Sequence, residues 1–77
     1  MRSQDFTKLL RYIHEKQQSI YDMTNLLSFN VYVKNDPKEC KICISNDLQT
    51  NDFTFFEHDD YHSTKFEIDN IFMKLLQ

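Results

Sequence analysis

The chain has 77 residues, an apolar content of 40% and a formal net charge of −3 at pH 7. This length allows a single domain with a small core, and seven Phe and four Tyr exclude a largely disordered chain. A chain without glycine cannot carry the glycine-rich phosphate loops of dinucleotide-binding or Walker A proteins. Left-handed turn positions are therefore expected at Asn or Asp.

The sequence predicts an intracellular protein. The N-terminus has no long apolar run of the kind found in secretory signals, and no later segment approaches the length of a membrane span. Two cysteines fit a reducing compartment. We therefore expect a cytoplasmic protein without membrane contact, in the host cytoplasm if a phage encodes it.

Residues 4–27 are predicted to form a long amphipathic helix. Its apolar residues recur with a period near 3.6, which is typical of a helix with one buried face. Ser3 is the expected N-cap, and Asp5 in the first turn complements the helix dipole. The apolar positions are Phe6, Leu9, Leu10, Ile13, Ile20, Met23 and Leu27.

A β-hairpin is predicted over residues 29–45. Apolar and polar residues alternate in 29–34 and again in 40–45, as in half-buried strands. Residues 35–39 between them contain Pro37 and form the turn. The expected inward-facing residues are Phe29, Val31, Val33, Cys40, Ile42 and Ile44.

The last third of the chain is expected to end in a second helix. Residues 46–52 are predicted to be a polar loop, whereas 53–58 fit either a third strand or a short capped helix. A turn follows at 59–60, and Thr64 with Glu67 fits a capping box. Apolar residues then form one stripe at Ile68, Ile71, Phe72 and Leu75.

These elements predict one α+β domain over residues 1–77 in the order αβββα. Both helices are expected on one face of a small antiparallel sheet.

Two cysteines and two histidines form a candidate zinc site. The spacing of these residues is C-x2-C, then fourteen residues, then H-x3-H, formed by Cys40, Cys43, His58 and His62. This stretch resembles a Cys2His2 zinc finger. The gap between the two pairs is two residues longer than usual, and the segment of the would-be recognition helix is acidic. Strand alternation favours a buried Cys40 and an outward-facing Cys43 instead, with ordinary surface histidines. The leading interpretation therefore has no metal and no cofactor.

Catalysis is not expected. His14 beside Glu15 and the acidic cluster with two histidines at 57–62 offer acid–base groups, but adjacent residues do not by themselves converge on a substrate. The chain has no nucleophile elbow and little interior for a pocket.

The charge is unevenly distributed along the chain. Residues 1–41 carry seven basic and five acidic side chains, whereas residues 42–64 carry five acids and no Lys or Arg. Acidic and aromatic side chains together suit docking on a basic protein surface rather than on nucleic acid itself. The alternative is a solvated loop that maintains solubility. The residues expected to bind a partner are Asp47, Asp52, Glu57, Asp59, Asp60 and Tyr61.

In size, charge and architecture, the chain resembles the small acidic inhibitors of phages and mobile elements, including anti-CRISPR proteins and other DNA mimics. The resemblance implies a non-enzymatic inhibitor that occludes the basic channel of a nucleic-acid-handling enzyme. It rests on no motif, so it assigns no residue a role. Two alternatives remain open: a zinc-stabilised interaction module, and a homodimeric structural or adaptor protein that associates through the first helix.

Overall fold

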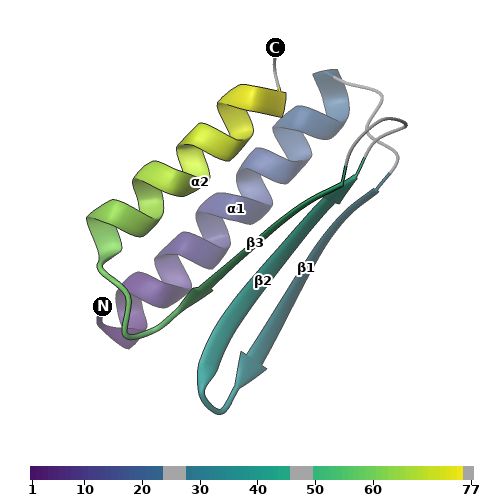
Figure 1. The fold of residues 1–77 in the computed structure, drawn as a ribbon. Helices are drawn as coiled ribbons and strands as arrows, with labels where there is room; N and C mark the ends of the chain where they lie inside the picture. Colours follow the sequence, from purple (N-terminus) through teal and green to yellow (C-terminus); the bar gives the residue numbers. More distant parts are fainter. Residues whose placement is uncertain (24–27, 46–49, 76–77) are drawn as a thin grey trace.

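A computed structural model contains five elements within the residues that it describes (Figure 1). The structure describes residues 1–23, 28–45 and 50–75. The predicted order αβββα and the α+β class are confirmed. The elements are α1 (Ser3–Met23), β1 (Ser28–Asn35), β2 (Lys38–Ser45), β3 (Thr50–Phe56) and α2 (Tyr61–Leu75).

The three strands form one antiparallel sheet in the order β1-β2-β3. Its register places Phe29 opposite Ile44, and Cys40 between Val33 and Phe55. Successive elements alternate in direction, so α1 and α2 run parallel to each other (Figure 1). The hairpin is therefore confirmed, with β2 as the central strand.

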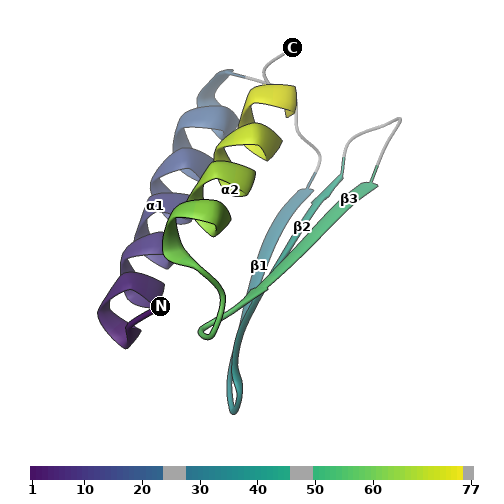
Figure 2. The same cartoon turned by 60° about the vertical axis from the view of Figure 1, so that its left-hand side comes forward.

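Both helices cover the same face of the sheet, and its other face is open (Figure 2). Because side chains alternate across a strand, the inward residues of β2 enter the core while their neighbours face outward. Each core residue is no more than 9% exposed. The core consists of Phe6, Leu9, Ile13, Ile20, Phe29, Cys40, Ile42, Ile44, Phe55, Ile68 and Phe72.

The first helix differs from its prediction at its beginning. The Phe6 N–H donates to the Arg2 carbonyl oxygen at 3.0 Å, so Arg2 precedes the first helical turn as its cap residue. The Ser3 hydroxyl does not cap the helix but donates to the Glu57 carboxylate. The helix continues to Met23, and the predicted end at 24–27 lies outside the described residues.

The beginning of the second helix is also corrected. Residues 53–56 belong to β3, which settles the ambiguity of 53–58 in favour of a strand. The helix α2 begins at Tyr61, three residues before the expected capping box, and Thr64 is buried within it. Asp60 caps the helix instead, because its carboxylate accepts the Ser63 N–H at 2.9 Å and its carbonyl accepts the Thr64 N–H.

The β1–β2 hairpin extends beyond the helices at its turn (Figures 1 and 2). Along β1, burial decreases from Phe29 at 9% exposure to Val33 at 44%, although both side chains lie on the same face. The turn contains a cis peptide bond between Asp36 and Pro37, and no described residue has a positive φ. The expectation of left-handed Asn or Asp residues is therefore not met in the described part of the chain.

Candidate functional site

The six residues predicted to bind a partner lie in two separate places. Asp52 is exposed in β3, opposite Cys43 in the register, on the face of the sheet that the helices leave open. Glu57, Asp59, Asp60 and Tyr61 follow the end of β3, in the connection to α2 and its first turn. Asp47 lies outside the described residues. The predicted single patch is thus divided along the length of β3.

Glu57 is half-buried and takes part in a polar network with residues far away in sequence. Its carboxylate accepts a hydrogen bond from the Ser3 hydroxyl and lies 3.6 Å from the Lys38 ammonium. Lys38 also donates to the Ser3 hydroxyl at 2.9 Å. The Ser3 hydrogen bond, together with the Lys38 charge, lowers the pKa of Glu57. Glu57 therefore remains ionised, but the nearby Lys38 ammonium of the same molecule offsets much of its charge.

The two aspartates of the connection stabilise backbone turns. The Asp59 carboxylate accepts the Phe56 N–H at 2.8 Å, and the Asp59 N–H donates to the Phe56 carbonyl at 3.0 Å. Asp60 caps α2, and the hydrogen bond from the Ser63 N–H lowers the pKa of its carboxyl group. Each carboxylate thus has a local structural role while its charge remains at the surface.

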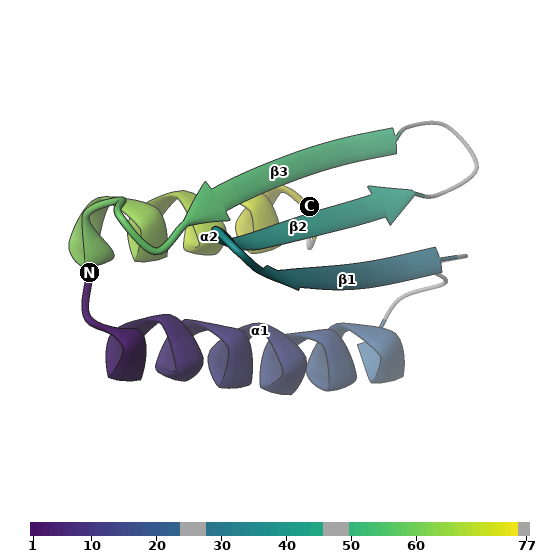
Figure 3. The ribbon, with the colours of Figure 1, turned by 90° about the horizontal axis from the view of Figure 1, so that it is seen from below.

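The amino group of Met1 binds the backbone of the connection between β3 and α2. It donates to the Glu57 carbonyl oxygen at 2.6 Å and to the Asp59 carbonyl oxygen at 2.8 Å. Figure 3 shows the N-terminus beside the connection between β3 and α2. The positively charged Met1 amino group therefore lies next to the acidic connection, and no sequence pattern predicted this position.

Tyr61 is less exposed for contact with a partner than its place in the acidic segment predicted. Its ring is half-buried against the core, and the Lys8 ammonium lies 5.6 Å from the ring centre. His62 packs edge-on against the same ring. Tyr61 therefore anchors the beginning of α2 to α1, and its ring contributes little free surface.

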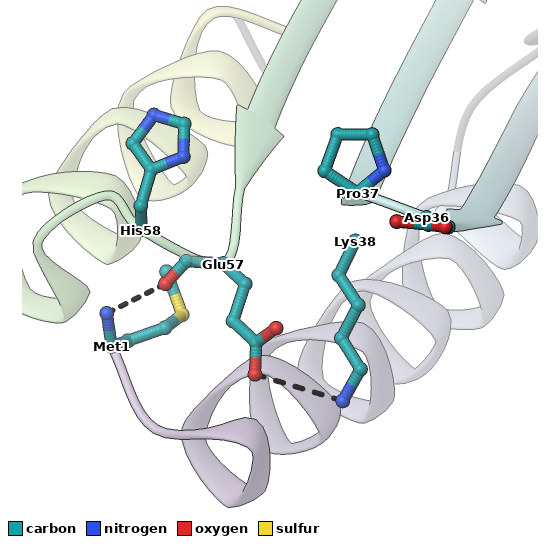
Figure 4. Close-up of a pocket in the computed structure, with 6 residues that line it drawn as sticks. All are labelled: Met1, Asp36, Pro37, Lys38, Glu57 and His58. Atoms are coloured by element: carbon teal, nitrogen blue, oxygen red, sulfur yellow. Dashed lines mark hydrogen bonds and ion pairs between the residues drawn. The ribbon is translucent and has the colours of Figure 1, made fainter.

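An open pocket of about 390 Å³ lies between the hairpin turn, the N-terminus and the end of β3 (Figure 4). Asp36 and Pro37 line it from the hairpin, and Glu57 and His58 line it from the connection. Met1 and Lys38 complete the lining, and both direct their ammonium groups to atoms of Glu57. We call Asp36, Glu57, Asp59 and Asp60 the acidic end.

Asp36 was not among the predicted partner-binding residues. Within the described residues it makes no ion pair, and it is exposed at the hairpin turn. The sequence signal that could have identified it is Pro37, because this proline marks the turn that carries Asp36 to the surface. The acidic end therefore joins two segments that are separate in sequence.

The candidate zinc ligands are not brought together. Cys40 is fully buried on the inner face of β2, whereas Cys43 faces outward and is half-buried. His58 is exposed in the turn after β3, where its ring stacks on Phe56 at 5.2 Å between centroids, and His62 is exposed in α2. No group of three or more candidate metal ligands occurs among the described residues. The arrangement does not fit a Cys2His2 site.

A second polar cluster joins the two helices. The Tyr12 hydroxyl donates to the Asp69 carboxylate, which also accepts from the Lys65 ammonium at 3.2 Å. Lys65 and Lys16 lie over the Tyr12 ring at 4.7 and 5.7 Å from its centre. Burial and the bond to Asp69 raise the pKa of Tyr12 to about 12. This cluster fixes α1 against α2, and no sequence motif indicated it.

Comparison of the chain with protein-family models, with curated proteins and with solved structures gives no match. In the part of the chain that the structure describes, no helix combines the length and apolar character needed to cross a membrane.

Proposed function

We propose that this protein is a non-enzymatic protein-binding module whose acidic end docks on the basic surface of a nucleic-acid-handling enzyme. The observation that carries the proposal is the meeting of acidic groups from two separate segments around one open pocket. Asp36 from the hairpin and Glu57 from the connection before α2 line the pocket. Asp59 and Asp60 follow Glu57 in the same connection, outside the pocket lining.

The pocket suits a cationic side chain of the partner. Asp36 and Glu57 line it from different segments, so an inserted Arg or Lys would find carboxylates on both sides. Pro37 and the Met1 side chain provide apolar surface for the stem of such a residue. The local cations, Lys38 and the Met1 amino group, form internal contacts with Glu57. The carboxylates of Asp36, Asp59 and Asp60 form no ion pair with either of these cations, although the Asp59 carboxylate lies 3.7 Å from the His58 ring.

The proposed mode of action is occlusion. Several carboxylates on a small rigid surface can occupy the positions that phosphates would otherwise take in a basic channel. The protein would then act as an inhibitor of the anti-CRISPR or DNA-mimic kind, and would carry out no chemistry.

The proposal can be tested with charge-neutralising substitutions that preserve the turns. Asn accepts backbone N–H groups nearly as well as Asp at a helix cap, so Asp60→Asn removes charge and keeps the cap. Wild type, Asp36→Asn, Asp60→Asn and the double variant are immobilised, and an enzyme retained from a host extract is purified. Its association rate is then measured at low and high ionic strength, with duplex DNA as competitor.

We expect the double variant to associate roughly tenfold more slowly at low ionic strength, with a smaller difference at high ionic strength. DNA should displace the enzyme from the wild type. Asp52→Asn is the matched control, because it removes the same charge from the open sheet face, away from the acidic end. An association rate that depends on neither salt nor the acidic-end substitutions would refute the proposal.

A further inference from the structure

The outward face of α2 carries two large apolar side chains that the fold leaves uncovered. Phe66 is 67% exposed and Met73 is 60% exposed. They are separated by two helical turns, and Asn70 lies between them, also exposed. At about 100° per residue, the three positions fall within an arc of about 60°. They form one stripe along the helix, which we call the α2 stripe.

Two opposite charges accompany the α2 stripe on the same flank. Glu67 follows Phe66 directly, and Lys74 follows Met73 directly, so each charge has the same position relative to its apolar neighbour. Both side chains are exposed, and neither makes an ion pair within the described residues. Seven residues separate them, which is too far for a contact along one helix.

This pattern is self-complementary when two copies of α2 lie antiparallel. A two-fold axis through Asn70 brings Phe66 of one copy within one residue's rise of Met73 of the other, and Glu67 within the same rise of Lys74. Charges on the same flank meet in an antiparallel pair of helices. A parallel pair related by a two-fold axis places this flank of the two copies on opposite sides, so Glu67 and Lys74 of the two copies cannot pair there. The charges of Glu67 and Lys74 are therefore complementary to those of an antiparallel second copy of α2.

We propose that the α2 stripe is a homodimer interface, in which two copies of α2 pack antiparallel about Asn70. Aromatic residues and Met are enriched in interface centres, and the polar flank then supplies the rim. The contact covers about two helical turns, so the association should be weak and concentration-dependent. The α2 stripe shares no residue with the acidic end.

Sedimentation velocity over a range of protein concentrations tests the interface directly. The wild type should shift from monomer to dimer as concentration rises. Phe66→Asp and Met73→Asp should each weaken dimerisation at least about tenfold, with unchanged circular dichroism because both side chains are exposed. A wild type that is monomeric throughout, or an association that both substitutions leave intact, would overturn the proposal.

Charge exchange tests the antiparallel geometry. Glu67→Lys or Lys74→Glu alone places like charges together and should weaken the dimer, whereas the double variant should restore it. Glu15→Lys on the exposed surface of α1 makes the same charge change elsewhere and should leave the dimer unaffected. If the double variant dimerises no better than either single variant, the antiparallel arrangement is wrong.

Discussion

Asp60 has two roles that can be separated experimentally. Its carboxylate caps α2 by accepting the Ser63 N–H, and its charge contributes to the acidic end. Asp60→Ala should lower the free energy of unfolding, whereas Asp60→Asn should change it much less, because Asn also accepts the Ser63 N–H. Urea denaturation of both variants measures this difference. Equal losses would show that charge, rather than the hydrogen bond, stabilises the beginning of the helix.

The same cap has a pH dependence. Because the pKa of Asp60 is lowered in the folded state, its contribution to stability is present above the unfolded pKa. That contribution is lost as pH falls through the folded pKa. The destabilising effect of Asp60→Ala should therefore shrink at acidic pH, which urea denaturation at a series of pH values can follow.

Tyr12 should titrate later than an ordinary tyrosine. Burial and its hydrogen bond to Asp69 raise the pKa of its hydroxyl group to about 12. The ultraviolet absorbance of tyrosinate should therefore show a late phase that Tyr12→Phe removes. Asp69→Asn takes away the carboxylate charge and should lower the pKa of Tyr12. A titration curve that Tyr12→Phe leaves unchanged in its late phase would contradict this assignment.

At the scale of single residues, sequence patterns predicted burial better than polar partners. Cys40 was expected inside and is fully buried, because strand alternation determines which side chains of β2 face the helices. The partners of Glu57 could not be predicted in this way. Ser3 and Lys38 reach it only because α1 and the hairpin meet at one end of the fold.

Among the elements, β3 provides the sharpest test of the core. Phe55 is 1% exposed and its ring lies 5.5 Å from that of Phe6, so β3 and α1 pack through this pair. Phe55→Ala should lower the free energy of unfolding by about 3–5 kcal/mol. Tyr32→Ala on the open face, where the ring is 59% exposed, is the control and should have a much smaller effect. Thermal or urea denaturation compares the two.

The elements also show why some boundaries escaped prediction. The alternating pattern of the hairpin predicted β1 and β2, because one face is buried and the other solvated. In β3, Phe53, Phe55 and Phe56 are adjacent or nearly so, and Phe56 faces outward. Because of this run of aromatic residues, the sequence of β3 does not show the alternation of apolar and polar residues that is typical of a half-buried strand. For α2, Thr64 and Glu67 imitate a capping box, yet Thr64 is buried and the cap lies at Asp60.

At the scale of the whole molecule, the two cysteines report on global stability. Cys40 is fully buried and its burial raises the pKa of the thiol to about 12, whereas Cys43 is half-buried in the native fold. In a Cys43→Ser variant, thiol labelling should therefore require opening of the core. The labelling rate should rise with urea as the folded population falls. Native-state labelling as fast as in the unfolded chain would show that the core does not protect Cys40.

The acidic end itself could be predicted only in part from the sequence. The run of acids in 42–64 includes the connection before α2. The division of that run along β3, and the addition of Asp36, depend on how the hairpin turn meets the connection. Such contacts between distant segments have no periodic signature in the chain.

The stacking of Phe29 on Phe72 has a consequence for biosynthesis. These rings lie parallel, 6.0 Å apart, and join the first strand to the last helix. While the ribosome is still translating α2, the part of the sheet that α2 covers, including Phe29, is exposed to water or to chaperones. We therefore expect stable folding to begin late, once the final helical turns emerge, and protease resistance of stalled chains to appear abruptly at that point.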